Sequence, residues 1–266
     1  MTPAPSPNRR LAPQARRQEI VRLLLERDFV TVQELAERFG VSSMTIHRDL
    51  DILEEQLALR KVHGGATAQP SSLYESTLSY RLTVMTEAKR KIARRAVQFV
   101  TPGSSLILDN STTTLAMVPY LIEIPHLTVI TNFLNVLEHY RAPDQHDATL
   151  ILIGGNYRTN YNSTAGILTE RMLSELHADR CFISSSAIDA RAGIFHQEAE
   201  EARLKAAMIA AAKERYLLID SSKFSKSALY RVTDLESFDR IIVDDGISPE
   251  VLEELSRGDV PVDVAV

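Results

Sequence analysis

A run of hydroxyl side chains stands near the middle of the sequence. Residues 109–114 read Asp-Asn-Ser-Thr-Thr-Thr and follow a short apolar segment that ends at Leu108. Hydroxyl groups and free backbone N–H groups at the start of a helix can hold a phosphate group without a metal ion. Taken alone, the same residue types also cap helices. The candidate anion-binding residues are Asp109, Ser111, Thr112, Thr113 and Thr114.

Similar polar clusters follow other short apolar segments. They are a threonine–asparagine pair at 131–132, a glycine pair at 154–155 and the run Asp-Ser-Ser-Lys-Phe at 220–224. Singly, each is explained by turn chemistry or helix capping, but glycine also allows a close approach of ligand to backbone, and the lysine supplies positive charge. Four such clusters at one sheet edge favour a site for a small phosphorylated sugar or polyol. The further candidates are Thr131, Asn132, Gly154, Gly155 and Lys223.

The elements that must position these residues alternate between strand and helix. Short apolar segments that lack polar alternation indicate buried strands, and helical patterns separate most of them. This pattern predicts an α/β domain with a doubly wound, mostly parallel sheet, in which ligands bind beyond the carboxyl ends of the strands. The predicted strands are 105–108, 127–130, 149–153, 180–183, 216–219 and 240–243, and the predicted helices are 115–122, 133–139, 167–176, 198–212 and 249–255.

The first 66 residues predict a different kind of domain. A helix over 14–27 is followed by Thr31-Val32-Gln33-Glu34, a capping box that opens a helix ending at Gly40. Ser42 or Ser43 then caps a third helix that runs to about Glu55. A helix, a short glycine-containing turn and a second helix form the helix-turn-helix arrangement.

The third helix carries the residues that could read DNA. Ile46, Leu50 and Leu53 share one face, while Met44, Thr45 and Arg48 fall on the other. An arginine bonds guanine through two hydrogen bonds, and a threonine contacts a base or a thymine methyl group. A three-helix packing module with a solvated outer face is the alternative.

Residues 57–66 add a short strand and a glycine pair. This pattern predicts a wing whose basic side chains face DNA phosphates. The candidate DNA-binding residues are Ser42, Ser43, Met44, Thr45, His47, Arg48, Arg60, Lys61, His63 and Gly64.

Composition limits the remaining possibilities. The 266 residues carry a net charge of −5, with ten Lys and Arg against nine Asp and Glu in residues 1–66. The single cysteine, Cys181, permits no intrachain disulfide and fits a reducing compartment. No secretory signal is evident, and no apolar run reaches the roughly 20 residues that span a bilayer. We therefore expect a cytoplasmic protein with a DNA-binding domain at 1–66, a linker at 67–85 and an effector domain at 86–266.

The recognition-helix segment Val41–Leu50, followed by His63–Ala66, resembles the DeoR family of bacterial regulators. The resemblance implies a winged helix-turn-helix domain, an effector domain similar to ribose-5-phosphate isomerase, and homodimers or tetramers. It also adds Asp189 to the effector-binding candidates. His47 stands where the family most often has arginine, and Ser111 stands where glycine is usual.

Two functions from different classes remain open at this stage. The first is a DNA-binding repressor of a carbohydrate or polyol operon, relieved by a phosphorylated sugar or polyol, with no cofactor, metal or membrane partner. The second is a sugar-phosphate isomerase with an appended DNA-binding domain, for which Asp109, Asp189, Glu201 and Lys223 offer acid–base groups. A scaffold that binds neither DNA nor ligand is a third possibility.

Overall fold

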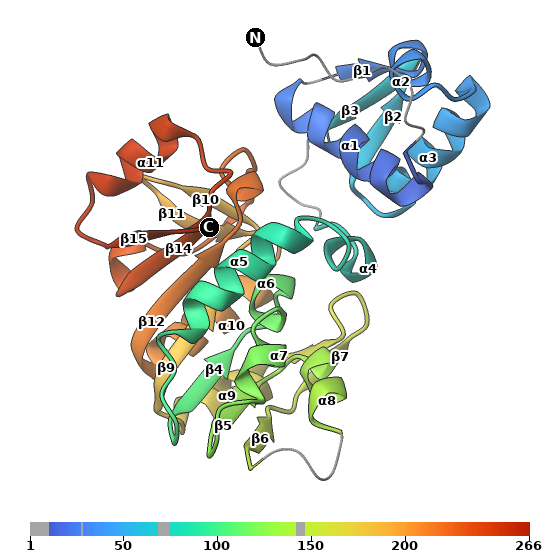
Figure 1. Ribbon diagram of the computed structural model, residues 1–266. Coiled ribbons are helices and arrows are strands. Elements are labelled where there is room, and N and C mark those ends of the chain that lie inside the picture. Colours follow the sequence, from blue (N-terminus) through green and yellow to red (C-terminus); the bar gives the residue numbers. More distant parts are fainter. Residues whose placement is uncertain (1–10, 28, 69–74, 142–146) are drawn as a thin grey trace. The chain divides into compact units, whose positions relative to one another are not determined.

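The computed structural model describes residues 11–27, 29–68, 75–141 and 147–266. The chain divides into two compact units, an N-terminal unit of Met1–Val84 and a C-terminal unit of Met85–Val266 (Figure 1). Each unit has its own hydrophobic cluster, and each is described by itself below.

The N-terminal unit contains the three predicted helices. Thr31 caps the second helix by accepting a hydrogen bond from the backbone N–H of Glu34, and Gly40 ends it in the left-handed conformation, at φ 62°. Ser42 caps the third helix in the same way through Thr45. The sequence-predicted helix-turn-helix is therefore confirmed. The helices are α1 (Pro13–Glu26), α2 (Val32–Phe39) and α3 (Ser43–Glu55).

A three-stranded antiparallel sheet completes this unit. Its strands are β1 (Phe29–Thr31), β2 (Leu59–Val62) and β3 (Gly65–Ala68), in the order β1-β3-β2. β2 and β3 form a hairpin whose turn includes Gly64 at φ 79°. A Cβ atom at Gly65 would lie 2.1 Å from the carbonyl oxygen of Val30, so glycine is required for β3 to pair with β1. The wing predicted from the glycine pair is this hairpin.

The segment expected to be a linker, 67–85, is in part packed structure. β3 continues to Ala68, and the short helix α4 (Leu78–Arg81) belongs to the N-terminal unit. Tyr80 of α4 is buried in the same hydrophobic cluster as the three long helices. α4 has only four residues, too few to show a helical pattern of apolar residues in the sequence. Residues 69–74 lie outside the described part of the chain.

The C-terminal unit is built on a parallel sheet, as predicted. Its described residues form seven strands, and every adjacent pair in this sheet is parallel. The order β15-β14-β12-β9-β4-β5-β6 reverses direction between β4 and β9, which marks the topological switch point of the sheet. The strands are β4 (Ser105–Leu108), β5 (Thr128–Thr131), β6 (Thr149–Leu152), β9 (Ala178–Ile183), β12 (Ala212–Ile219), β14 (Arg240–Asp244) and β15 (Val262–Ala265).

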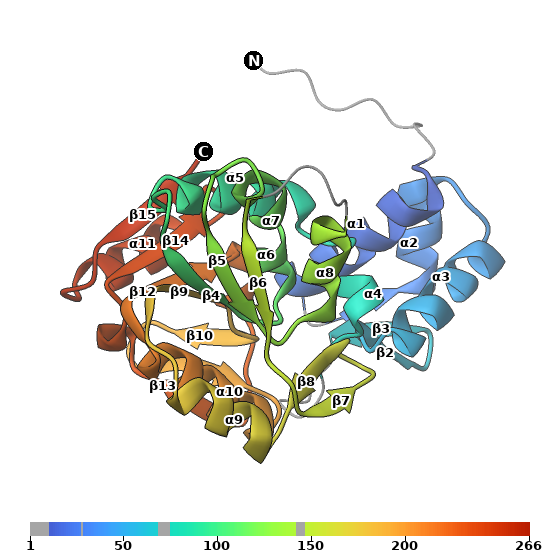
Figure 2. The same cartoon turned by 90° about the horizontal axis from the view of Figure 1, so that it is seen from below.

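Helices cover both faces of this sheet (Figure 2). The predicted helix at 115–122 is wrong as one element, because the chain forms two short helices on either side of Ala116 and Met117. The helices predicted at 133–139, 167–176, 198–212 and 249–255 agree with the structure to within two residues. The helices of this unit are α5 (Thr86–Val97), α6 (Thr112–Leu115), α7 (Val118–Leu121), α8 (Leu134–Tyr140), α9 (Ile167–Ser174), α10 (Ala199–Ala210) and α11 (Pro249–Ser256).

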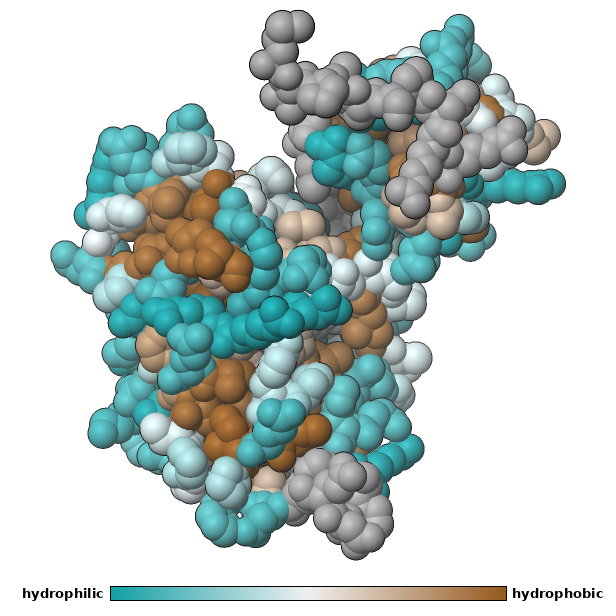
Figure 3. All heavy atoms as spheres, in the orientation of Figure 1, coloured by the Kyte–Doolittle hydropathy of each residue, from teal (hydrophilic) through white to brown (hydrophobic). Residues whose placement is uncertain are grey.

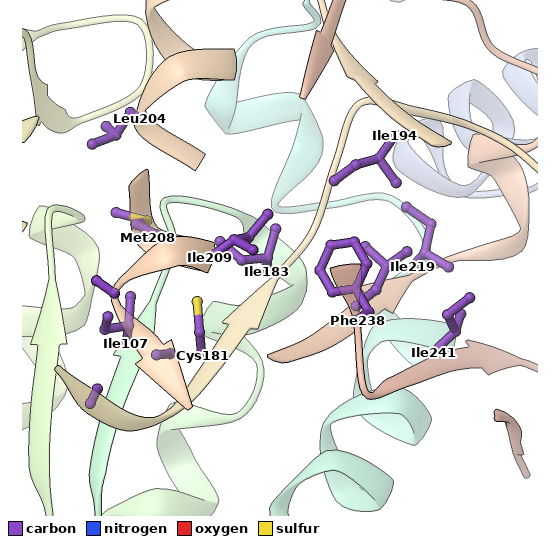
Figure 4. Packing of buried hydrophobic residues seen from close by; sticks show 14 of the residues in the cluster. Ile107, Cys181, Ile183, Ile194, Leu204, Met208, Ile209, Ile219, Phe238 and Ile241 are labelled. Atoms are coloured by element: carbon purple, nitrogen blue, oxygen red, sulfur yellow. The ribbon is translucent and has the colours of Figure 1, made fainter. Parts of the chain in front are cut away.

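The core between α10 and the sheet explains the apolar strand segments. Leu204 and Met208 of α10 pack with Ile107, Cys181 and Ile183 of the central strands (Figure 4). The alternate residues of these strands are also fully buried on the opposite face. A strand that is buried on both faces has no polar alternation, which is the pattern that the sequence shows.

Smaller elements were not predicted. One is a hairpin formed by β7 (Asn156–Arg158) and β8 (Ser163–Ala165). Another is a three-stranded sheet formed by β10 (Ala187–Asp189), β11 (Gly193–His196) and β13 (Tyr230–Thr233). Two short 3-10 helices, η1 (Ser221–Lys223) and η2 (Leu235–Ser237), complete the unit. Figure 3 shows a hydrophilic band over α5, where exposed basic side chains lie on the helix face opposite its buried residues.

Candidate functional site

The third helix of the N-terminal unit exposes the side chains that the sequence singled out. Ile46, Leu50 and Leu53 are fully buried, whereas Met44 is 63% exposed and His47 and Arg48 are exposed. The start of α3 is held by Ser42, whose hydroxyl lies 2.9 Å from that of Thr45. Ser43 is also exposed at this end. The outer face of the helix therefore carries one methionine among polar side chains that include one cation and an imidazole, a set suited to the major groove of DNA.

A buried ion pair fixes the position of this helix. Arg16 of α1 donates to Asp49 of α3 over 2.5 Å, and the two side chains are only 7% and 4% exposed. Arg17 donates to the other oxygen of the same carboxylate over 3.2 Å. Asp49 is thus committed to holding α3 against α1, which sets the orientation of the neighbouring Arg48.

The wing places its candidate residues in two different settings. Arg60, His63 and Gly64 are exposed, as a phosphate-contacting wing requires. The ammonium group of Lys61, by contrast, forms an ion pair with Asp51 of α3, and its backbone N–H donates to Glu54 over 2.8 Å. Lys61 therefore joins the wing to the recognition helix instead of standing free, which the sequence did not indicate.

In the C-terminal unit, the loop after β4 is organised by Asp109. This carboxylate is fully buried at the switch point and accepts from the Lys205 ammonium of α10 over 2.5 Å and from the Ser184 N–H after β9 over 2.9 Å. It also accepts from the Ser111 N–H and the Thr114 hydroxyl. Burial acts to raise the pKa of Asp109, but the Lys205 charge and these hydrogen bonds outweigh it and hold the pKa below its usual value.

The hydroxyl side chains of residues 111–114 divide into two that shape the loop, Ser111 and Thr114, and two that follow the helix cap, Thr112 and Thr113. The Ser111 hydroxyl accepts from the Thr114 N–H over 3.1 Å, and Thr114 donates back to Asp109, so these two side chains shape the loop. The alternative interpretation as a helix cap therefore holds for Ser111 and Thr114. Thr112 and Thr113 follow the cap, and the Thr113 hydroxyl lies 3.5 Å from that of Ser184. Both are at the point where sheet order reverses.

The end of β12 adds charge to the same edge of the sheet. Asp220 is fully buried and accepts from the Ser222 N–H over 3.2 Å. Burial acts to raise its pKa, but the charges of Lys223 and of Lys89 on α5 hold the pKa below its usual value. Lys223 is thus accompanied by a second, buried lysine, Lys89, which was not among the candidates from the sequence.

The comparisons with known proteins cover both units. Residues 16–72 match the family described as the DeoR-like helix-turn-helix domain. Residues 84–245 match the DeoR C terminal sensor domain. The chain belongs to the DeoR family.

Curated relatives of this DeoR-family chain match it over most of their length. A putative aga operon transcriptional repressor of Escherichia coli O157:H7 is 32% identical over 93% of this chain and 92% of its own. The glycerol-3-phosphate regulon repressor of Escherichia coli K12 is 32% identical over 85% and 88%. An L-fucose operon activator of Haemophilus influenzae is 31% identical over 86% and 91%.

Among solved structures, ribose 5-phosphate isomerase A from Methanocaldococcus jannaschii matches 51% of this chain and 53% of its own, at 17% identity and a TM-score of 0.37.

The remaining effector candidates of this DeoR-family chain have structural partners. The Thr131 hydroxyl accepts from the Phe133 N–H over 3.1 Å. The carbonyl oxygen of Gly154 accepts from the Thr169 hydroxyl, and a Cβ at Gly155 would lie 2.0 Å from that same hydroxyl. Gly155 therefore serves close packing of α9, a role that the sequence could not separate from ligand approach.

Asp189 lies elsewhere. Its carboxylate accepts from the Arg191 and Ala192 N–H groups in the exposed turn between β10 and β11. Asp189 therefore stabilises this turn through its carboxylate. None of its hydrogen bonds found among the described residues reaches the loop that follows β4.

Sequence reasoning did not place several polar residues beside this loop. Asn110 donates to Ser163 of β8 over 3.1 Å and to Glu201 of α10 over 3.0 Å. Glu201 and Lys205 are four residues apart and share one helix face, which is the only local signal for their pairing with the loop. The residues described by the structure include no cluster of three or more His, Cys, Asp or Glu that could hold a metal ion. Nor does any described helix combine the length and apolar character needed to cross a membrane.

Proposed function

We propose that this DeoR-family chain represses a carbohydrate or polyol catabolic operon and is released from its operator by a phosphorylated sugar or polyol. The names of its relatives support this class of target, since they include a putative aga operon repressor and a glycerol-3-phosphate regulon repressor. In this proposal α3 and the β2–β3 wing contact double-stranded DNA, and the loop after β4 binds the effector phosphate.

The observation that carries the proposal is the position of the hydroxyl loop at the switch point. Asp109 ties the end of β4 to Ser184 after β9 and to Lys205 of α10, so the loop backbone is fixed before any ligand arrives. Thr112 and Thr113 then offer hydroxyl and N–H donors, and Lys223 offers positive charge at the end of β12. A preorganised set of donors at this place suits a small anion.

The arrangement also argues against an isomerase. A general base needs a free carboxylate near the substrate proton. The four groups that donate to Asp109 and the position of Asp189 in an exposed turn leave these two candidate acid–base groups unsuited to that role. Glu201 keeps one oxygen without a partner among the described residues, so the choice against an isomerase rests also on the relatives, which are named as transcriptional regulators. We therefore propose a regulator without catalysis. Assays of isomerisation with pentose and hexose phosphates should show no turnover, and turnover abolished by Lys223→Ala would overturn this assignment.

We propose that the chain binds DNA as a symmetric oligomer. Two recognition helices are needed to contact the two half-sites of a palindromic operator. We propose at least a homodimer acting in the cytoplasm. Sedimentation of the protein with and without an operator fragment should give two or more chains per site, whereas a single chain per full site would contradict it.

The effector part of the proposal is tested by Thr113→Val. The change removes one hydroxyl at nearly constant volume in a side chain that is 2% exposed. Operator binding without ligand should be unchanged, while release by a panel of sugar and polyol phosphates should require at least about tenfold more ligand, the loss of roughly one hydrogen bond to a charged group. Thr149→Val, at the start of β6, is the matched control. Unaltered induction in Thr113→Val would contradict the phosphate-loop assignment.

A further inference from the structure

Glu201 has an oxygen atom that the protein does not satisfy. Its side chain in the first turn of α10 is fully buried, and its Oε2 accepts from Asn110 over 3.0 Å. Its Oε1 has no hydrogen-bond partner among the residues that the structure describes. A buried acceptor without a donor is costly and uncommon in folded proteins. This oxygen is therefore a place where a donor on a bound molecule would be recognised.

A second acceptor lies along the same strip of structure. Asn132 is fully buried, and its Nδ2 donates to the carbonyl oxygen of Thr164 over 2.7 Å, which fixes the orientation of the amide. The other amide atom, Oδ1, has no partner within the described residues. Ser163, the neighbour of Thr164 on β8, accepts from the same Asn110 that contacts Glu201. Asn110 thus links Glu201 to β8, the strand that Asn132 also contacts.

The charges at this end of α10 disfavour a second anion. Glu198 and Glu200 both form ion pairs with Arg158 of β7, so this cation is already shared by two carboxylates. Tyr161 also donates to Glu198 over 2.9 Å. Burial raises the pKa of the Glu201 carboxyl, while the Lys205 charge opposes that rise. A ligand group that enters here must supply hydrogen-bond donors without adding negative charge.

We propose that Glu201 and Asn132 form a hydroxyl-recognition subsite for the uncharged end of a phosphorylated polyol or sugar, and that this subsite rejects phosphorylated sugar acids. The inference rests on the proposed function for the phosphate end of the ligand. Asn110 directly precedes Ser111 in the hydroxyl loop, so the subsite lies next to the loop that would hold the phosphate.

Two sets of three ligands, with equal chain length within each set, test this subsite in the wild-type protein. Glycerol 3-phosphate, 3-phosphoglycerate and n-propyl phosphate share three carbons and differ in the donors and charge at the far end. Sorbitol 6-phosphate, 6-phosphogluconate and n-hexyl phosphate form the corresponding six-carbon set. By calorimetric titration, at least one polyol phosphate should bind about tenfold or more tightly than its alkyl and acid counterparts. Equal affinities within both sets would overturn the proposal.

Glu201→Gln assigns the preference to this side chain. The amide has nearly the same shape but presents one acceptor fewer, so the preference for the polyol phosphate should fall by about tenfold while binding of inorganic phosphate stays within twofold. Glu214→Gln near the start of β12 is the matched control, and the calorimetric transition of the C-terminal unit reports that the variant is folded. A preference that survives Glu201→Gln in the folded variant would refute the assignment.

The experiment separates this subsite from the proposed function. If polyol and alkyl phosphates bind equally and both release the operator, the subsite is refuted and the proposed effector class stands. If unphosphorylated glycerol or sorbitol binds as tightly as its phosphate and Glu201→Gln abolishes that binding, the subsite stands and the phosphate requirement is refuted. If no compound of either set binds, both proposals are contradicted.

Discussion

Replacement of Lys205 by methionine should destabilise the C-terminal unit strongly. Lys205 is the cationic partner of Asp109, and the two side chains are 4% and 0% exposed. Methionine fills a similar volume but leaves the Asp109 carboxylate buried without a counter-ion. Loss of one partner of a buried pair typically costs about 3–5 kcal/mol. At about 2–4 °C per kcal/mol for domains of about 150–250 residues, this corresponds to a fall of about 6–20 °C in Tm.

The pH dependence of this loss follows from the pKa of Asp109. In the wild-type protein this pKa lies below its usual value, so the stabilisation is present above the unfolded pKa of about 3.9 and is lost as the pH falls through the folded pKa. In Lys205→Met burial raises the pKa, because the opposing charge is gone, and the protonated acid tolerates burial. The difference in the free energy of unfolding should therefore be largest at neutral pH and should shrink towards pH 4.

Scanning calorimetry of the full chain at pH 7 and near pH 4 measures both effects. The transition of the N-terminal unit is an internal reference, and Lys213→Met, an exposed position of β12, should change stability by less than about 0.5 kcal/mol. A loss in Lys205→Met that is below about 1 kcal/mol at pH 7, or that grows as the pH is lowered, would refute the role given to this pair.

Three further changes test other parts of the structure. Arg48→Ala should cost roughly 1–3 kcal/mol in operator affinity and relax base preference at one position, as measured by anisotropy titrations with operator variants. Unchanged affinities across the operator variants would show that Arg48 does not read a base. Asp49→Asn should lower the Tm of the N-terminal unit, because the buried Arg16 loses its partner at a cost of about 3–5 kcal/mol, and a calorimetric trace identical to wild type would contradict this. Gly155→Ala should lower the free energy of unfolding of the C-terminal unit by about 1–3 kcal/mol, because its Cβ would lie 2.0 Å from the Thr169 hydroxyl. Gly154→Ala should be nearly neutral, because its Cβ would meet only a methionine sulfur at 3.9 Å. Equal losses of stability in the two variants would argue against the packing role of Gly155.

Local signals were sufficient for most of the elements. Thr31 and Gly40 set the ends of α2 through hydrogen bonds and backbone conformation that depend only on nearby residues. The central strands could be recognised because residues such as Ile107 and Cys181 are buried on one face and their neighbours on the other. β15 escaped prediction because Asp263 interrupts its apolar residues, and in the fold this aspartate binds Arg95 and Arg240.

The site was harder to predict than the fold because its contacts join distant segments. Asp109 was expected to face the effector, but a lysine 96 residues away and the backbone after β9 use its oxygens. Glu201 was considered only as an acid–base group of the isomerase alternative, and its unsatisfied oxygen becomes visible once Asn110 is placed against it. Asp189 is also a carboxylate, but it sits in a hairpin turn. Residue type and strand order locate the sheet edge, but the partners of each side chain depend on packing.

We propose that an anion in the loop that follows β4 changes how the N-terminal unit binds duplex DNA. The most direct measurement is a closed thermodynamic cycle with an operator fragment and the tightest-binding polyol phosphate. Operator affinity is measured with and without saturating ligand, and ligand affinity is measured with and without operator. We predict that the two affinities change by the same factor, about 5–150-fold, because coupling between two sites is reciprocal. Operator affinity that is unchanged at saturating ligand would contradict the claim.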